Sequence, residues 1–550
     1  MSTRCPKLPG KLVLLYFAGA DRHAASTVER PTLPRTALFT ASLVVVLLVA
    51  STLWTGAQPA EAGSTARFEP GTCPITPEPI PALQTARCGH LVVPESRSTP
   101  NGRMIRLPVA IVPAASESPP PDPVVFMTGG PGAAAILDTP FLVDAGVNRD
   151  RDLIIMSQRG TLYSDPDLNC PELDRYYGRQ VSLVYDSPST GRRQAAAARR
   201  CHDRLVEAGM DLSAYNTTEN AADFADLRRV LGIHAWNVYG YSYGSDLALS
   251  FMRDHPDGIR TVTIDSVAPP DIVGLTWTWS SAREGITAVF EACAAEPGCA
   301  TRYPDLLGTF THLVRRLEAD PLVARVRPPQ GGAPVQVVLD GGTLVNILVG
   351  NAVKPPDVPA AIHELAQGNP QRFLEARAAA SVVAEVPELA HGMTQSFACR
   401  EWEPYGSPGA ILRAGRQEFP RFPTSVLRNA PQLPFEAELC RVWNVPKGPV
   451  SQRTRVHSDI PTLVISGTFD AKSGAQWGRY AASTLAQSTY VRINGIGHWV
   501  IPQSPCAQSI FQSFLSTPLS PETACTAETR PAPFTIADDN PSEDLVTDLP

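Results

Sequence analysis

The turn Gly240-Tyr241-Ser242-Tyr243-Gly244 constrains the fold of this chain more than any other feature. It directly follows the strand-like run 235–239, and a helical pattern through Met252 directly follows it. A glycine two positions to either side of Ser242 lets a strand and a helix approach closely, and so tight a turn strains the serine backbone. A G-x-S-x-G match by itself is weak, and an inert serine in a glycine-rich turn is the alternative. The strand–turn–helix context predicts that Ser242 is a nucleophile.

Buried strands alternate with helices on both sides of this turn. Apolar runs typical of buried strands occur at 123–127, 152–156, 261–265, 461–467 and 490–493. A helix with Thr217 or Thr218 as its N-cap leads into the strand before Ser242, and a last helix is expected near 507–515. This alternation predicts a mostly parallel sheet with helices on both faces, and the runs 90–94 and 107–112 predict an antiparallel start.

Changes of pattern divide the chain into five parts. The predicted parts are a targeting segment at 1–62, a first part of the α/β core at 66–270, an inserted helical cap at 271–450, a second part of the core at 451–525 and an acidic, disordered tail at 526–550. The cap is predicted because the strand–helix rhythm gives way to helices broken by Pro and Gly. The tail is predicted because acidic residues and prolines replace apolar ones.

The first part has the pattern of an export signal. Arg30 and Arg35 precede an unbroken apolar stretch at 37–54, and small residues with an A-x-A-like end at 60–62 follow. The apolar stretch is close to the length of a membrane span, about 20 residues, so an uncleaved anchor is the alternative to a cleaved signal peptide. We expect a secreted or extracytoplasmic protein that contacts a membrane only through this segment.

Cysteine usage supports export. Of 11 cysteines, only Cys5 precedes the signal, and the even set of ten that is left fits up to five disulfides in an oxidising compartment. Pairing neighbours in sequence order would close five modest loops, although spacing does not determine connectivity. The chain has no C-x-x-C and no H-E-x-x-H, so no metal site is expected. The net charge of −7 argues against a nucleic-acid partner, which would need a basic face.

A serine nucleophile needs a base, and the base needs an acid that orients it. In the α/β-hydrolase fold these follow in the chain order Ser, Asp, His. Asp470 follows the strand 461–467, and His498 lies between glycines and a tryptophan after the next strand. Both therefore lie at the carboxyl ends of strands, where open α/β sheets bind ligands. The alternatives are a helix N-cap role for Asp470 and a structural role for His498.

Acyl transfer also needs hydrogen-bond donors for the oxyanion. The glycines of 128–132 follow the strand 123–127, so the backbone N–H of Gly129 or Gly130, together with that of Tyr243, is predicted to form the oxyanion hole. The same loop imitates a dinucleotide-binding fingerprint, with Asp152 about 20 residues further on. Pro131 removes a donor inside that turn, so no cofactor is expected.

Several motifs in the same order resemble the tripeptidyl aminopeptidase and proline iminopeptidase family of exported α/β-hydrolases. The matching stretches are Thr128-Gly129-Gly130-Pro131-Gly132, Gln158-Arg159-Gly160-Thr161, Asn216-Thr217-Thr218, Asp226-Leu227-Arg228, the turn from Gly240 to Ser245, Cys399-Arg400-Glu401-Trp402, Cys440-Arg441-Val442-Trp443 and the TAP-like region from Gly467 to Cys525. The resemblance covers roughly 70–525. The chain departs from it with Thr128 in place of His, Ser157 in place of Asp and Asn444 in place of Pro.

The resemblance implies a serine aminopeptidase with a triad of Ser242, Asp470 and His498, which releases tripeptides or N-terminal residues through an acyl-enzyme. It also implies a cap carboxylate that holds the substrate's free amine, and by motif position this is Glu401; the alternative is a solvated helix acid. The departures at Thr128 and Ser157 favour a second hypothesis, an esterase or lipase-like hydrolase with the same triad. A catalytically silent binding protein is the third. The expected partner is a peptide or a small ester.

Overall fold

The computed structural model describes residues 66–536, except 273–274, 385–386 and 388. The predicted export signal at 1–62 and the end of the tail at 537–550 lie outside the described residues. Within the described part of the chain, no helix has the length and apolar character that a membrane span requires.

One nine-stranded sheet organises the core, in the order β1-β2-β3-β5-β4-β6-β7-β10-β11. Its strands are β1 (Arg67–Gly71), β2 (Arg87–Pro94), β3 (Met104–Val112), β4 (Val124–Met127), β5 (Leu153–Met156), β6 (Trp236–Tyr241), β7 (Ile259–Asp265), β10 (Thr462–Gly467) and β11 (Ser488–Ile493). The pairs from β1 through β3 to β5 are antiparallel, and all pairs from β5 to β11 are parallel. The prediction of a mostly parallel sheet with an antiparallel start is confirmed.

Helices cover both faces of this sheet because its strands are apolar on both sides. Val125 and Met127 of β4 pack in one apolar cluster, and Val124 and Phe126 pack in another on the opposite face. Helices α4 (Thr217–Val230), α5 (Tyr243–Asp254) and α16 (Ala475–Ala482) contribute to the first cluster, and α1 (Thr139–Asp144) and α17 (Pro505–Ser516) contribute to the second. The N-cap of α4 is Asn216, whose side chain accepts the N–H of Glu219, so the prediction of Thr217 or Thr218 was wrong.

The chain between β7 and β10 forms most of a second, largely helical layer with its own apolar cluster. Its helices are α6 (Trp277–Ala295), α7 (Pro297–Arg302), α8 (Leu306–Ala319), α9 (Gly341–Val349), α10 (Val358–Ala366), α11 (Gln371–Ala379), α12 (His391–Phe397), α13 (Pro408–Glu418), α14 (Thr424–Leu427) and α15 (Glu436–Trp443). An antiparallel hairpin of β8 (Leu322–Val326) and β9 (Val335–Leu339) accompanies them. We call this layer the cap.

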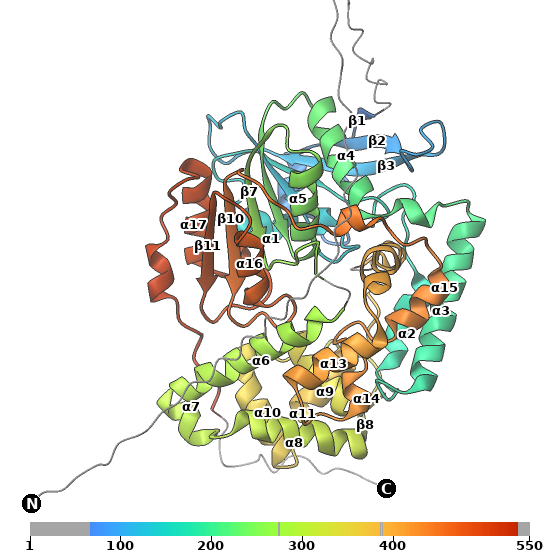
Figure 1. Ribbon diagram of the computed structural model, residues 1–550, viewed down its shortest axis with the longest axis vertical. Coiled ribbons are helices and arrows are strands. Elements are labelled where there is room, and N and C mark those ends of the chain that lie inside the picture. The colour runs from blue at the N-terminus through green and yellow to red at the C-terminus, as the bar shows by residue number, and fades with distance from the viewer. Residues whose placement is uncertain (1–65, 273–274, 385–386, 388, 537–550) are drawn as a thin grey trace, which may run out of the picture. The chain divides into compact units, whose positions relative to one another are not determined.

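Two helices from an earlier part of the chain also pack with the cap. Figure 1 shows α2 (Pro171–Gln180) and α3 (Pro188–Glu207) beside α15, and α3 contacts α15 directly. The segment between α2 and α3 joins the hairpin, since the N–H of Val338 donates to the carbonyl of Val181 at 2.8 Å. The sequence predicted a cap from 271–450 only, because it gave no signal that these helices pack with the cap.

The residues from 526 to 536 are ordered, which corrects the prediction of a disordered tail from 526. The disulfide Cys506–Cys525 ties the start of this segment to α17. Phe534 is buried in the apolar cluster of the cap, and the N–H of Thr535 donates to the carbonyl of Pro356 at 3.0 Å. One aromatic anchor and one disulfide therefore hold a segment whose composition is typical of disorder.

The ten described cysteines pair with their sequence neighbours. The disulfides are Cys73–Cys88, Cys170–Cys201, Cys293–Cys299, Cys399–Cys440 and Cys506–Cys525. Cys399–Cys440 joins the segment after α12 to α15, whereas Cys293–Cys299 joins the adjacent helices α6 and α7.

We expect these two cap disulfides to differ in their contribution to stability. A link across 41 residues removes more entropy from the unfolded chain than one across 6. Replacing Cys399 and Cys440 by alanine should lower the free energy of unfolding by about 4 kcal/mol, against about 2 kcal/mol for Cys293 and Cys299. Urea denaturation of the two double variants measures this, and equal losses would contradict the chain-entropy argument.

Candidate active site

Ser242 occupies a strained turn between β6 and α5. Its backbone has φ 55° and ψ −127°, a positive φ that non-glycine residues rarely adopt. Its N–H donates to the carbonyl of Asp265 at 3.0 Å, and its side chain makes no capping bond to α5. The turn thus holds the serine backbone in place and leaves its hydroxyl available.

The glycines of the turn are required by close contacts. A Cβ at Gly240 would overlap the carbonyl of Gly244, and a Cβ at Gly244 would overlap the carbonyl of Met127 at the end of β4. Neither position has room for a side chain, because α5 packs directly on the sheet. This is the close approach of strand and helix that the sequence pattern predicted.

Asp470 and His498 meet at the carboxyl ends of β10 and β11. His498 Nδ1 lies 3.0 Å from Asp470 Oδ2, and the other carboxylate oxygen accepts the N–H groups of Lys472 at 2.9 Å and Ser473 at 3.0 Å. Asp470 therefore contacts the imidazole and also accepts two backbone N–H groups of the turn that follows it. Its alternative role as a helix N-cap does not apply, because the N-cap of α16 is Gly474. Burial raises the pKa of Asp470, but the charge of His498, its hydrogen bond and the two backbone N–H groups together hold that pKa below its ordinary value.

One cavity of about 590 Å³ is lined by both Ser242 and His498. Ser242, Tyr243 and His498 line it, together with Gly130. The cap contributes an apolar wall of Trp277, Val349, Leu389, Trp402 and Leu433. Ser242 and His498, which lie 256 positions apart in the numbering, are thus brought to one space between the sheet and the cap.

The glycine loop after β4 lies against Ser242. A Cβ at Gly129 would be 2.9 Å from the Cβ of Ser242 and 3.3 Å from its Oγ, so the loop backbone reaches the serine itself. Gly130 has φ 108° and lines the cavity. Tyr243 is the first residue of α5, so its N–H is one of those that a helix leaves without an intrahelical partner. The three predicted oxyanion residues are therefore gathered around Ser242.

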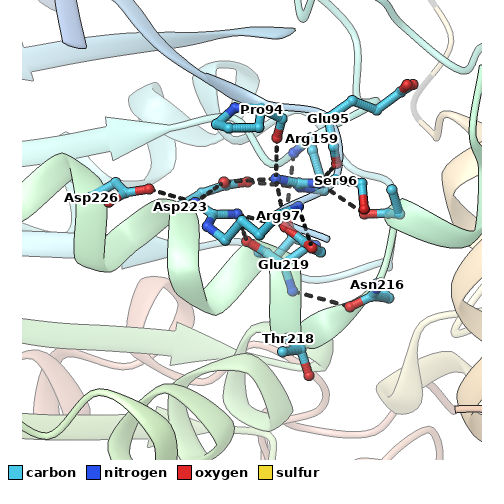
Figure 2. A network of polar contacts seen from close by, with 12 residues as sticks. Pro94, Glu95, Ser96, Arg97, Arg159, Asn216, Thr218, Glu219, Asp223 and Asp226 are labelled. Atoms are coloured by element: carbon cyan, nitrogen blue, oxygen red, sulfur yellow. Dashed lines mark hydrogen bonds and ion pairs between the residues drawn. The ribbon is translucent and has the colours of Figure 1, made fainter. Parts of the chain in front are cut away.

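A buried polar network supports this loop. Gln158 Nε2 donates to the carbonyl of Thr128 at 2.9 Å, which holds the loop from behind. The next residue, Arg159, is fully buried and donates from Nε and Nη2 to both oxygens of Asp223 on α4, each at 2.8 Å. Figure 2 shows Arg97 joining the same carboxylate, with Glu219 and Asp226 beside it. The Gln158-Arg159 motif thus connects the loop beside Ser242 to α4.

Glu401 does not reach the cavity, which corrects its predicted role as the amine anchor. Its side chain is 1% exposed, and Oε1 accepts the N–H of Thr217, the first residue of α4, at 2.8 Å. Ala398 and Trp402 of the same helical turn do line the cavity, so the turn presents those residues to the cavity and Glu401 to the core. A carboxylate at a helix N-terminus is stabilised by the helix dipole and the unpaired N–H groups.

Asp138 is a cavity residue that the sequence analysis passed over. It ends the short helix η2 (Ala135–Asp138) after the glycine loop, and it lines the same cavity as Ser242. Its position directly after the glycine loop and before a proline-containing helix start was the available signal. That position is also typical of an ordinary helix N-cap.

Two family models match the chain, "alpha/beta hydrolase fold" at 122–283 and "TAP-like protein" at 430–526. Among curated relatives, a tripeptidyl aminopeptidase of Streptomyces coelicolor is 27% identical over 202 residues, 35% of this chain and 36% of the relative. The serine protease Hip1 of Mycobacterium tuberculosis is 26% identical over 34% of this chain and 36% of its own. A proline iminopeptidase of Xylella fastidiosa is 29% identical over 28% of this chain and 52% of its own.

These matches confirm the resemblance that the motifs predicted. The chain has the α/β-hydrolase fold, and its C-terminal part is similar to TAP-like proteins. The alignments span about a third of the tripeptidyl aminopeptidase and of the Hip1 protease, and about half of the proline iminopeptidase.

We expect Glu401→Gln to change the pH dependence of stability while leaving activity close to that of the wild type. Burial, reinforced by the charge of Asp246, raises the pKa of Glu401 from 4.5 to about 7. The folded protein therefore binds this proton more tightly than the unfolded chain does. The resulting stability is fully present below about pH 4.5 and is lost as the pH rises to about 7, by up to about 3 kcal/mol.

Glutamine keeps an acceptor for the N–H of Thr217 but has no proton to lose. The free energy of unfolding of the variant should therefore fall less between pH 5 and pH 8 than that of the wild type. Urea denaturation at both pH values measures this, with Glu207→Gln, an exposed carboxylate at the end of α3, as the control. Identical pH slopes in all three proteins would contradict the argument.

Proposed function

We propose that this hydrolase is an exported serine aminopeptidase in which Ser242, His498 and Asp470 form the catalytic triad. The observation that carries the proposal is the hydrogen bond of 3.0 Å between His498 and Asp470, in a cavity that His498 shares with the strained Ser242 turn. A carboxylate, an imidazole and a serine at the carboxyl ends of parallel strands in one sheet are the parts that acyl transfer requires.

In the proposed reaction, Ser242 Oγ attacks the carbonyl carbon of the scissile bond while His498 takes the hydroxyl proton. Asp470 accepts from Nδ1 of His498, so it fixes the tautomer and stabilises the imidazolium that forms. The backbone N–H groups of Gly129 or Gly130 and of Tyr243 stabilise the oxyanion. His498 then protonates the leaving amine, the C–N bond breaks, and water hydrolyses the acyl-enzyme by the same steps in reverse.

Two observations support a short peptide as the substrate. The matched relatives are named as a tripeptidyl aminopeptidase, a serine protease and a proline iminopeptidase. The cavity of about 590 Å³ lies within the range of about 300–1,000 Å³ that is usual for small-molecule sites, and the cap closes one side of it.

The five disulfides support an oxidising, extracytoplasmic location.

A carboxylic ester hydrolase is the second candidate. Thr128 and Ser157 differ from the His and Asp that the aminopeptidase motifs lead us to expect. Within the described residues, the buried hydroxyl of Ser157 has no hydrogen-bond partner, so this position does not anchor the loop as a carboxylate would. The triad serves esters equally well, because an alkoxide leaves more readily than an amine.

The triad assignment predicts large and specific losses of turnover. Ser242→Ala, His498→Ala and Asp470→Asn should each lower kcat by roughly three to six orders of magnitude without unfolding the protein. Ser118→Ala, at an exposed loop position, should not change kcat. A fluorophosphonate probe should label the wild type at Ser242, as located by peptide mass spectrometry. Labelling at another serine, or near-normal turnover by Ser242→Ala, would refute the assignment, and no labelling at all would favour the silent binding protein.

The peptidase proposal predicts a preference for a free N-terminus. The wild type should hydrolyse a free-amine tripeptide nitroanilide at least about tenfold faster, in kcat/KM, than its N-acetylated form, because a charged amine contributes binding that the blocked one lacks. Mass spectrometry of the products from a longer peptide gives the length of the fragment released. Rapid cleavage of nitrophenyl esters with no peptide cleavage would establish the esterase instead.

A further inference from the structure

A carboxylate lies on the wall of the Ser242 cavity with no role in the mechanism above. Asp138 follows the glycine loop and immediately precedes α1, at the position where an Asp usually caps a helix. Its side chain makes no capping bond to α1. The carboxylate instead accepts a hydrogen bond from the Thr128 hydroxyl and lines the cavity that holds Ser242 and His498. The usual structural explanation for an Asp at this position therefore does not apply.

No positively charged partner for Asp138 occurs among the described residues. Its carboxylate accepts a hydrogen bond from the neutral hydroxyl of Thr128. The enclosed surroundings raise the pKa of Asp138 to about 7, against the opposing effect of the Thr128 hydrogen bond. A carboxylate removed from water without a counter-ion is costly. A cationic group entering the cavity would remove much of this cost.

Asp138 also contacts the loop that lies against Ser242. Its charge contributes to raising the pKa of Tyr241, the neighbour of Ser242 in the turn, after burial, which is the larger cause. The ring of Tyr241 lies against Gly129, since a Cβ there would be 3.1 Å from the ring. Thr128, which donates to Asp138, belongs to the same loop. The carboxylate is therefore part of the cavity wall beside the loop that lies against Ser242.

We propose that Asp138 binds a cationic nitrogen of the substrate and so determines which substrates are cleaved. This rests on the proposed function only in that the substrate occupies the Ser242 cavity. Among the described residues that line the cavity, Asp138 is the only carboxylate, and it belongs to the core and not to the cap. The nitrogen is either the α-ammonium of a peptide N-terminus or the side chain of a lysine or arginine.

The test compares Asp138→Asn with the wild type. Asparagine keeps an acceptor for the Thr128 hydroxyl and removes only the charge. Asp144→Asn is the matched control, because it makes the same change at an exposed residue at the end of α1. For a free-amine tripeptide nitroanilide, Asp138→Asn should lower kcat/KM by about 10- to 100-fold, the range expected for a hydrogen bond to a charged group. Hydrolysis of nitrophenyl acetate should stay within about twofold in both variants.

Blocked substrates distinguish the two sources of the cation. If Asp138 binds the α-ammonium, N-acetylation of the peptide should lower kcat/KM of the wild type about as much as Asp138→Asn does. In the Asp138→Asn variant, N-acetylation should lower kcat/KM only slightly further. If it binds a side chain, the loss should instead follow the replacement of lysine by norleucine in the peptide. Equal losses on peptides and on the acetate ester would mean that Asp138 only supports the Thr128 loop. No loss on any cationic substrate would equally overturn the proposal.

The pH profile of the wild type gives a readout that does not depend on the variant folding. If Asp138 binds the α-ammonium, the ratio of kcat/KM for the free-amine peptide to that for the acetylated peptide should rise as the pH increases toward about 7, where Asp138 gains its charge. The ratio should fall again above about pH 8, where the α-ammonium of the peptide loses its proton. His498 acts on both substrates, so its titration cancels in the ratio. The other titratable side chains on the cavity wall are Tyr241, Tyr243 and Lys472. A ratio that does not change with pH, both for the free-amine and acetylated pair and for the lysine and norleucine pair, would contradict the proposal.

Failure of the peptidase proposal can be distinguished from failure of this one. If the wild type cleaves esters but no peptides, alanine nitrophenyl ester and nitrophenyl propionate replace the peptides, since they differ mainly by the amine. Asp138→Asn should then slow the alanine ester by about 10- to 100-fold and leave the propionate unchanged. Equal rates for the two esters in wild type and variant would overturn the role of Asp138, whatever the natural substrate is.

Discussion

The buried ion pair between Arg159 and Asp223 is the interaction on which the geometry of the site depends. Both side chains are fully buried, and breaking a buried pair of this kind typically costs about 3–5 kcal/mol. Arg97 and Glu219 extend the pair into a network, with Arg97 on Asp223 and Glu219 beside Arg159. The pair fixes the segment after β5 to α4, and Gln158, one residue earlier, holds the carbonyl of Thr128. The backbone that lies against Ser242 is therefore positioned by charges on the far side of the loop. The carboxylate of Asp223 on α4 thus helps to position the loop at the active site, although it lies outside the cavity.

The same helix receives the cap. The N–H of its first residue, Thr217, donates to Glu401, and the hydroxyl of Thr217 lies 3.1 Å from the hydroxyl of Tyr243. Asn220, one turn further along α4, accepts the N–H of Arg159 at 3.2 Å. α4 therefore connects the ion pair, the residue after the proposed nucleophile and the cap in one polar assembly. The position of Glu401, beside the disulfide Cys399–Cys440, is explained by this assembly: its buried carboxylate attaches the cap to the core.

The sequence predicted the parts of the molecule that local pattern decides. Continuous apolar runs marked the parallel strands, and Ser242, Asp470 and His498 follow such runs, so a parallel sheet had to bring them to one edge. Patterns could not give the direction in which Glu401 points, because that depends on the phase of a π-helical turn at 398–402. The packing of α2 and α3 on α15 and the ordering of the residues up to 536 depend on tertiary contacts. Asp138 was missed because an Asp before a helix is usually an N-cap. Only the structure shows that its side chain makes no capping bond and accepts from the Thr128 hydroxyl instead.

The cavity wall has an apolar side from the cap and one carboxylate from the core. This arrangement explains how the proposed triad could be selective for one class of substrate. On the cap side the lining is largely apolar, with Trp277, Trp402 and Leu433, and such a surface separates side chains that differ by a methylene by only about 1–3 kcal/mol. Discrimination by charge is stronger, since a carboxylate that has lost water favours a cation and disfavours its neutral analogue. In the proposal above, Asp138 supplies that charge from the end of η2 in the core, beside the loop that is proposed to stabilise the oxyanion. Asp138 contacts the same loop that lies against Ser242, so in this proposal recognition of the substrate and alignment of the scissile bond depend on one loop.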